Sequence, residues 1–320
     1  MSQQGAKVSL KEERAERNFD FGLTMPDIAV WNKCDNKCIM CTNMRSFVLQ
    51  NPRQYSLKWQ IKKFEKYLKG EDVYHKNADK SSYISLTGGE PTLHPDFLKF
   101  VAYLRKRVPD VQVTLLTNGK KFADQEFAKK FFAIANPPFE IAVSIHGSTA
   151  AKHDRISGAK GSFHRTLEGL KNIFRFSRGQ KTEIRVVLIK QNISDFGDLV
   201  KMLLKKLAAA RDYRVVVIHY EIEGISFENR QKIALRFEDS SFAIMKNLNF
   251  IKRFKEFRLY HFPLCVLPPV LRRYAWVTLP KEERIYTKKC RGCVLRKNCL
   301  GLMREYYKFF GDAEIKAVSK

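Results

Sequence analysis

The sequence has few acidic residues for its length and lacks any long apolar run. Asp and Glu number 33 against 59 Lys and Arg, a formal net charge of +26 that disfavours a basic partner surface. No stretch approaches the roughly 18 uninterrupted apolar residues of a membrane span, and the N-terminal segment lacks the apolar core of a signal peptide. We therefore expect a cytoplasmic protein with no membrane partner.

The 320 residues, 44% of them hydrophobic, suffice for a large core. Short runs rich in Val, Ile and Leu alternate with helical patterns near 57–69, 95–107, 121–134, 162–177 and 194–209. The candidate strands are Asp27–Trp31, Tyr83–Thr87, Val111–Thr117, Glu140–Ile145, Glu183–Ile189 and Arg214–His219. This order predicts an α/β fold with parallel strands and crossover helices. Six units are too few for a closed eight-stranded barrel, so we expect a partial (β/α)6 barrel over 24–235.

The segments outside the barrel lack its regular pattern. Residues 1–23 are charged and aperiodic, which indicates a tail, and 236–260 resemble one amphipathic helix. Residues 261–310 are rich in Pro, Cys and aromatic residues without a repeat. Because such a region often folds around a metal, we expect 236–320 to form a small irregular, cysteine-rich, metal-binding extension.

Three of the seven cysteines follow the first strand as Cys34, Cys38 and Cys41. In a cytosolic chain, cysteines at such spacing indicate metal ligands or reactive thiols rather than disulfides. Thiolates suit iron–sulfur clusters and zinc. Zinc would need a distant fourth ligand, whereas an iron–sulfur cluster with three cysteines leaves one iron open to a ligand. Spacing alone leaves both alternatives open.

A second motif, Ser85-Leu-Thr-Gly-Gly-Glu-Pro91, ends the second strand. Paired glycines let a ligand approach the backbone closely, and a carboxylate beside exposed carbonyls can receive an ammonium group. Taken alone, however, a Gly-Gly pair indicates first of all a turn.

The cysteine motif and Gly-Gly-Glu-Pro together resemble the radical SAM enzyme superfamily. The resemblance continues through Thr117-Asn118-Gly119, Ser144-Ile-His-Gly147 and the segment from His153 to Phe163. It implies a [4Fe-4S] cluster on the three cysteines, with S-adenosylmethionine (SAM) chelating the fourth iron. An electron from a donor such as flavodoxin or ferredoxin then cleaves SAM, and the resulting 5′-deoxyadenosyl radical abstracts hydrogen from the substrate. The protein supplies positioning and excludes competing reactions.

The resemblance also implies a set of residues that contact SAM. These are Met40, Gly88, Gly89, Glu90, Pro91, Asn118, Ser144 and Arg155. The Gly-Gly-Glu segment would receive the methionine ammonium, and Ser144 would face the carboxylate or ribose. Arg155 is a candidate carboxylate partner, with a surface arginine as the alternative, and Asn118 serves the turn before any cofactor. Met40 occupies a position that is usually aromatic and lies by the adenine.

The four late cysteines are Cys265, Cys290, Cys293 and Cys299. Their spacing resembles the twitch and SPASM extensions of radical SAM enzymes, which implies a second [4Fe-4S] cluster. Structural zinc is the alternative for four cysteines. Full ligation leaves no open iron, so such a cluster would relay electrons or hold the fold. Neighbouring basic residues would stabilise the thiolates; a nucleic-acid patch is the rival interpretation.

The substrate is the least determined feature. A charge of +26 suits RNA, but the basic residues are scattered over helical segments, where charge usually serves solvation. With only about 23 residues before the barrel, we expect neither a leader-peptide recognition domain nor an RNA-binding appendage. A peptide or small metabolite is therefore favoured, with an RNA-modifying radical SAM enzyme or a non-catalytic, RNA-binding metal-cysteine protein as alternatives. Glu221 and Glu223, after the sixth strand, can hold substrate or accept a proton.

Overall fold

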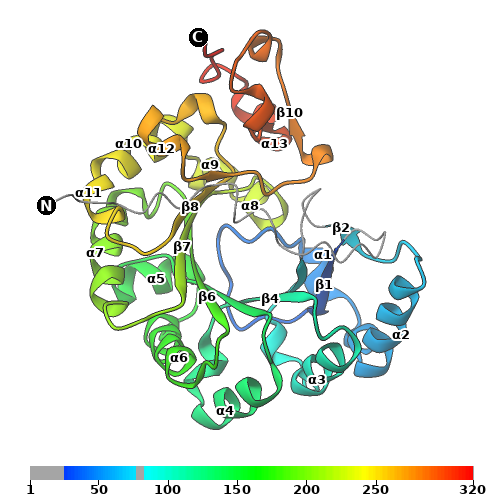
Figure 1. Cartoon of the computed structure of the whole chain (residues 1–320). Coiled ribbons are helices and arrows are strands. Elements are labelled where there is room, and N and C mark those ends of the chain that lie inside the picture. The colour runs from blue at the N-terminus through cyan, green and yellow to red at the C-terminus, as the bar shows by residue number, and fades with distance from the viewer. Residues whose placement is uncertain (1–24, 77–82, 320) are drawn as a thin grey trace, which may run out of the picture.

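A curved nine-stranded sheet forms the centre of the computed structural model, which describes residues 25–76 and 83–319. Its order is β2-β1-β3-β4-β5-β6-β7-β8-β9, and every neighbouring pair is parallel except β1 and β2. The strands are β1 (Pro26–Trp31), β2 (His75–Lys76), β3 (Tyr83–Gly88), β4 (Gln112–Thr117), β5 (Phe139–Ser144), β6 (Lys181–Leu188), β7 (Tyr213–His219), β8 (Phe257–Tyr260) and β9 (Ala275–Trp276). The sheet curves into an open ring with helices outside it (Figure 1). The expected partial barrel and its six strands are confirmed.

Most of the α-helices in the described residues lie outside the ring, whereas α13 lies apart from it near the C-terminus (Figure 1). The helices are α1 (Arg45–Leu49), α2 (Leu57–Leu68), α3 (Phe97–Arg107), α4 (Gln125–Ile134), α5 (Ala150–Ser157), α6 (Ser162–Phe176) and α7 (Phe196–Lys206), followed by α8 (Gly224–Glu228), α9 (Arg230–Ile233), α10 (Phe237–Lys246), α11 (Leu248–Ile251), α12 (Pro269–Arg272) and α13 (Arg304–Phe310). Aromatic rings fill part of the helix–sheet core: Phe131 stacks on Phe97 at 6.1 Å and meets Phe122 edge-on at 5.0 Å. This apolar layer holds the strands in place from outside.

The two faces of the sheet differ in chemistry. On β5, Ile141 and Val143 belong to the apolar core, whereas Glu140 pairs with Arg214 of β7. Successive side chains of a strand point to opposite faces, so Glu140 faces the ring's interior. The outer face is thus a hydrocarbon core and the inner face carries charged groups.

The expectation of one amphipathic helix over 236–260 is wrong. The segment forms α10 and α11, which meet at Asn247, and then the strand β8. Tyr260 of β8 packs with Val216 and Ile218 of β7. A four-residue strand is too short to reveal its period beside two helices, and pairing with β7 decides its conformation.

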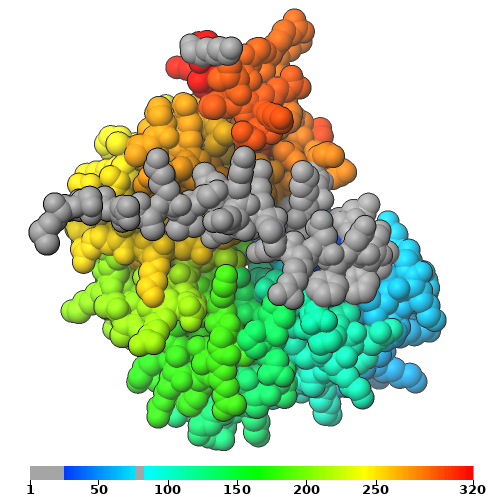
Figure 2. Space-filling model, in the orientation of Figure 1, coloured from blue at the N-terminus to red at the C-terminus, as the bar shows by residue number. Residues whose placement is uncertain are grey.

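The last part of the chain forms a small irregular lobe that projects from the barrel (Figure 2). It contains the hairpin of β10 (Arg284–Ile285) and β11 (Leu302–Met303), several single 3-10 turns, and α13. None of the helices in the described part of the chain has the length and apolar content needed to cross a membrane.

Candidate functional site

The sequence motifs gather where the parallel strands end. The cysteine loop follows β1, the Gly-Gly-Glu segment follows β3, Asn118 follows β4, and Ser144 ends β5. In parallel barrels this carboxyl-terminal edge is where active sites assemble. The topology therefore brings motifs far apart in sequence to one rim.

The loop that carries Cys34, Cys38 and Cys41 is fixed by backbone hydrogen bonds from two sides. The amide of Lys37 donates to the carbonyl of Ser157 at the end of α5, at 2.7 Å. From the other side, the amide of Ser226 in α8 donates to the carbonyl of Cys41 at 2.8 Å. The loop is thus held between α5 and α8, and its thiols lie at the rim.

A buried lysine holds the first half of this loop. Lys120 follows the turn after β4 and is 6% exposed. Its Nζ lies 2.9 Å from Oδ2 of Asp35 and donates to Oδ1 of Asn36 at 2.6 Å. Asn118 Nδ2 also donates to Asp35, at 2.7 Å. This network was missed from sequence, although a Lys directly after the Thr117-Asn118-Gly119 turn was its visible signal.

The early thiols fit an iron–sulfur cluster in donor chemistry. Burial, reinforced by the neighbouring thiols, raises the pKa of Cys38 to about 12, and a bound cationic centre would favour the thiolate. The amide of Asn36 points at Sγ of Cys34 at 3.4 Å, a hydrogen bond that suits a thiolate ligand. Among the described residues, no group of three Cys, His, Asp or Glu is spaced for a single metal ion.

Gly88 and Gly89 make room for the cysteine loop itself. A Cβ on Gly88 would lie 2.4 Å from the carbonyl oxygen of Trp31, and one on Gly89 would lie 2.4 Å from that of Lys33. The amide of Gly89 donates to Trp31 and that of Glu90 to Lys33, at 2.7 and 2.8 Å. The backbone of Trp31 and Lys33 therefore approaches the two glycines as closely as we expected a ligand to do.

Glu90 lies inside the rim and is 2% exposed. Its Oε1 accepts hydrogen bonds from the Thr92 amide and hydroxyl and from the Thr117 hydroxyl, and its Oε2 accepts from the Asn118 amide at 2.7 Å. Burial raises the pKa of Glu90, and these donors oppose that shift. The carboxylate therefore ties the ends of β3 and β4 together, while Pro91 begins the following 3-10 turn.

The other residues predicted to contact SAM lie in different surroundings. Ser144 is half-buried, Arg155 is exposed on α5, and Met40 is buried in the apolar core. The buried His153 accepts the amide of His146 through Nδ1 at 3.1 Å. That histidine therefore orients backbone.

Sequence reasoning also missed a charged cluster inside the ring. Arg214 Nε donates to Glu183 at 2.7 Å and its guanidinium also binds Glu140, while Arg185 pairs with Glu183. Burial raises the pKa of Glu183, but the two arginines outweigh it and lower the pKa to about 2. The sequence did contain a sign of this cluster, because charged residues occur within strands that are otherwise mostly apolar.

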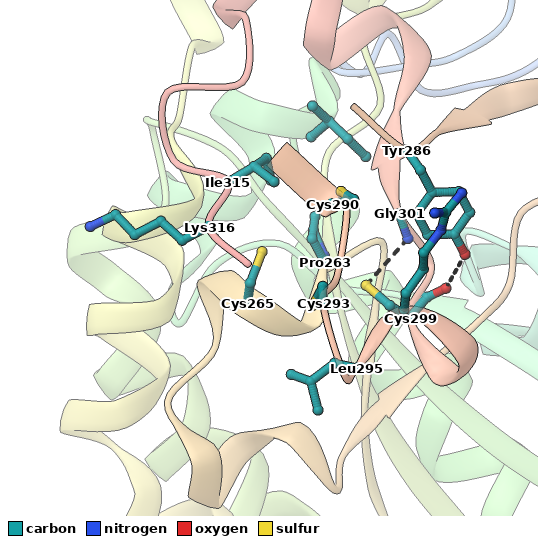
Figure 3. A pocket seen from close by; sticks show the side chains of 12 residues that line it. Pro263, Cys265, Tyr286, Cys290, Cys293, Leu295, Cys299, Gly301, Ile315 and Lys316 are labelled. Carbon is teal, nitrogen blue, oxygen red and sulfur yellow. Dashed lines mark hydrogen bonds between the residues drawn. The ribbon is translucent and has the colours of Figure 1, made fainter. Parts of the chain in front are cut away.

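The four late cysteines line one pocket. Cys265, Cys290, Cys293 and Cys299 surround about 350 Å³ of empty space, part of which opens to solvent, together with apolar residues such as Leu295. Figure 3 shows the four side chains around this space. Cys265 comes from the segment after β8, and the other three come from the loop between β10 and β11. The lobe thus brings together thiols separated by up to 34 positions.

Backbone amides point at two of these sulfurs. Sγ of Cys299 accepts from the amides of Leu264 and Gly301, at 3.2 and 3.4 Å, and Sγ of Cys293 accepts from Val318 at 3.4 Å. Such hydrogen bonds stabilise anionic sulfur ligands. The pocket therefore fits a thiolate-ligated metal centre.

Comparison with known proteins agrees with this arrangement. The family model described as "Radical SAM superfamily" matches residues 28–203, more than half of the chain. "Mycofactocin maturase MftC" of Mycolicibacterium smegmatis is 26% identical over 205 residues, 63% of this chain and 48% of the relative. "Fe-coproporphyrin III synthase" of Methanosarcina barkeri is 29% identical over 192 residues, 58% of this chain and 43% of the relative. The chain thus matches a little under half the length of these relatives.

Two further similarities are weaker. "GTP 3',8-cyclase" of Pasteurella multocida is 32% identical over 124 residues, 38% of this chain and 35% of the relative. The solved structure "Native anSMEcpe with bound AdoMet" has a TM-score of 0.49 and 16% identity, over 71% of this chain and 60% of that one.

Proposed function

Because the chain belongs to the radical SAM superfamily, we propose that it cleaves SAM reductively at a [4Fe-4S] cluster and removes a hydrogen atom from a peptide or small-molecule substrate. Cys34, Cys38 and Cys41 would hold the cluster. When bound, the cluster supplies the electron for SAM cleavage, a reaction that protein side chains alone do not perform.

The observation that carries this proposal is the construction of the cysteine loop. The three thiols stand on one short segment, and Lys120 and Ser226 fix that segment through the bonds described above. Preorganised ligands lower the cost of assembling a site. The chain therefore provides a rigid three-thiol platform at the rim.

The remaining residues would bind and orient SAM. We assign the Gly88–Glu90 segment to the methionine ammonium, with backbone carbonyls and the second lone pair of Glu90 Oε2 as acceptors. Ser144 would contact the carboxylate or ribose, Arg155 the carboxylate, and Asn118 would hold the turn. Met40 would pack its polarisable thioether against the adenine ring.

We further propose a second [4Fe-4S] cluster in the late cysteine pocket, in a twitch- or SPASM-like lobe, with zinc as the alternative. Four thiols around an empty pocket suit a cluster of several atoms better than a single ion. The backbone amides that point at the sulfurs favour an anionic cluster. With four protein ligands, this centre would transfer electrons or hold the lobe.

The external partner would be an electron donor such as flavodoxin or ferredoxin. A chain of net charge +26 would attract an acidic donor over long range. The names of the relatives cover a maturase, a porphyrin synthase and a nucleotide cyclase, so the substrate must be sought experimentally.

The test is anaerobic reconstitution followed by reduction in the presence of SAM. We expect a brown protein, an electron paramagnetic resonance signal that changes when SAM is added, and release of 5′-deoxyadenosine. A colourless, zinc-loaded protein that retains RNA and releases no 5′-deoxyadenosine would refute the proposal and favour the non-catalytic alternative.

A further inference from the structure

His261 has an unusual backbone conformation at the rim of the barrel. It directly follows β8 and has φ of +68°, the only positive φ of a non-glycine residue in the described part of the chain. An L-residue with a β-carbon enters this left-handed region at an energetic cost, and such strain persists where neighbouring contacts require it. The contacts of the imidazole should therefore account for this conformation.

The imidazole is held by one nitrogen only. Nδ1 lies 3.2 Å from the carbonyl oxygen of His219 and 3.3 Å from Oε1 of Glu221. A carbonyl oxygen can only accept, so Nδ1 carries the hydrogen, and Nε2 of the neutral ring carries the lone pair. Burial lowers the pKa of His261 to about 4, which keeps the ring neutral.

The only contacts of the ring with the described residues are those of Nδ1, so Nε2 reaches solvent, although the side chain as a whole is only 9% exposed. The Glu221 carboxylate and the His219 carbonyl fix the tautomer and orient the ring. An acceptor that is oriented in this way and open to solvent can receive the hydrogen-bond donor of a ligand.

This pair lies close to the early cysteine loop. The Ser226 hydroxyl donates to the carbonyl of Glu221, and the Ser226 amide donates to the carbonyl of Cys41. One serine thus connects the backbone of Glu221 with the backbone of a proposed cluster ligand. His261 and Glu221 are therefore on the rim where the proposed chemistry would take place.

The local charge is acidic, unlike the chain as a whole. Burial, together with the nearby carboxylates of Glu221, Glu223 and Asp27, raises the pKa of Glu283 to about 7. Burial and the carboxylate of Glu221 likewise raise the pKa of Glu223 to about 7. Arg185, which lies near Glu221, already pairs with Glu183. Such a surface repels phosphate and attracts a cation.

We propose that His261 and Glu221 form a substrate-binding pair at the rim, which receives a cationic or amide-type N–H group of the substrate through Nε2 of His261 and the surrounding carboxylates. The inference rests on the proposed function and narrows its substrate class: the reacting portion carries nitrogen donors rather than phosphate. RNA phosphate would be held elsewhere or not at all.

The experiment measures how fast diethyl pyrocarbonate modifies His261 in the cluster-loaded protein, with peptide mass spectrometry as the readout. Methylguanidinium is the cationic probe and uridine monophosphate the anionic one. We expect His261 to be modified, and methylguanidinium at millimolar concentration to slow that modification severalfold. Uridine monophosphate should have no such effect, and the exposed His164 of α6 should respond to neither probe.

Two variants test the assignment further. Glu221→Gln keeps an acceptor for Nδ1 but removes a negative charge, so protection by methylguanidinium should fall by half or more. His261→Asn introduces a residue that also tolerates positive φ, so the circular dichroism of this variant should match that of the wild type.

Three results would overturn the inference: an unreactive His261, protection by uridine monophosphate alone, or full protection in Glu221→Gln. Release of 5′-deoxyadenosine without substrate serves as an independent readout. If it persists while protection fails, only this inference is lost, whereas its absence would count against the proposed function.

Discussion

The ammonium group of Lys120 lies 2.9 Å from the carboxylate of Asp35, and thereby joins the end of β4 to the segment between Cys34 and Cys38. The same nitrogen also donates to the backbone carbonyl of Asp35 at 3.0 Å. A cation that bonds both backbone and side chain restricts how the loop can move. The position of the early thiols therefore depends on a residue 85 positions away.

Lys120→Met should loosen the cysteine loop without touching a thiol. Hydrogen bonds of charged groups contribute about 1.5–3 kcal/mol each, and part of that is lost here because Asp35 is partly exposed. We expect iron bound after reconstitution to fall toward the value of Cys38→Ala. Lys130→Met, at an exposed position of α4, should retain wild-type iron. Wild-type iron in Lys120→Met would contradict the role assigned to Lys120.

The glycine that begins α8 should be required for contact with the cysteine loop. Gly224 and Gly70 both have positive φ, but a Cβ on Gly224 would lie 2.2 Å from the carbonyl oxygen of Thr42, whereas nothing lies within 4 Å at Gly70. Each alanine substitution costs about 1 kcal/mol of backbone strain. Overpacking adds about 1–3 kcal/mol at Gly224 alone.

Urea unfolding should therefore rank Gly224→Ala clearly below Gly70→Ala in stability. The first variant should also bind less iron. Indistinguishable unfolding midpoints would mean that α8 can shift away from the loop at little cost.

The two cysteine clusters should differ in what their loss does. Cys38→Ala removes one of three early ligands and should abolish 5′-deoxyadenosine formation. Cys293→Ala disrupts the late pocket and should leave SAM cleavage without substrate measurable, if that centre transfers electrons or supports the lobe. Both variants should be assayed for iron, for folding by circular dichroism, and for 5′-deoxyadenosine. Complete loss in both, with the fold intact, would refute this division of roles.

Stability should fall in acid because histidines are buried in neutral form. Burial lowers the pKa of His153 to about 4, below the 6.5 that is usual for histidine. A depressed pKa contributes stability that is present above the unfolded value and is lost as pH falls toward the folded one. From pH 7 to pH 5, this loss is about 2 kcal/mol for one such group.

His153→Gln should accordingly show a flatter dependence of unfolding free energy on pH between 7 and 5. It should still be less stable at pH 7, because the bonds of His153 to His146 and Ser162 are altered. His164→Gln, at an exposed position, should run parallel to the wild type. Parallel curves for His153→Gln would show that His153 is not buried in neutral form.

The sequence by itself determined the six-strand rhythm, the parallel α/β class and the placement of each motif at a strand end. These features follow from local periods and short spacings: Cys34, Cys38 and Cys41 share a loop wherever that loop lies. The family resemblance drawn from those motifs is confirmed by the match over residues 28–203.

Only the tertiary structure decided which distant groups meet. The hydrogen bond from Asn118 to Glu90, the close approach of Gly89 to Lys33 and the contacts of His261 depend on strand order and on how the ring closes. Residues 257–260 likewise form the strand β8 because they pair with β7. Sequence period fixes which face of an element is apolar, but contacts between elements arise from the packing of all of them at once.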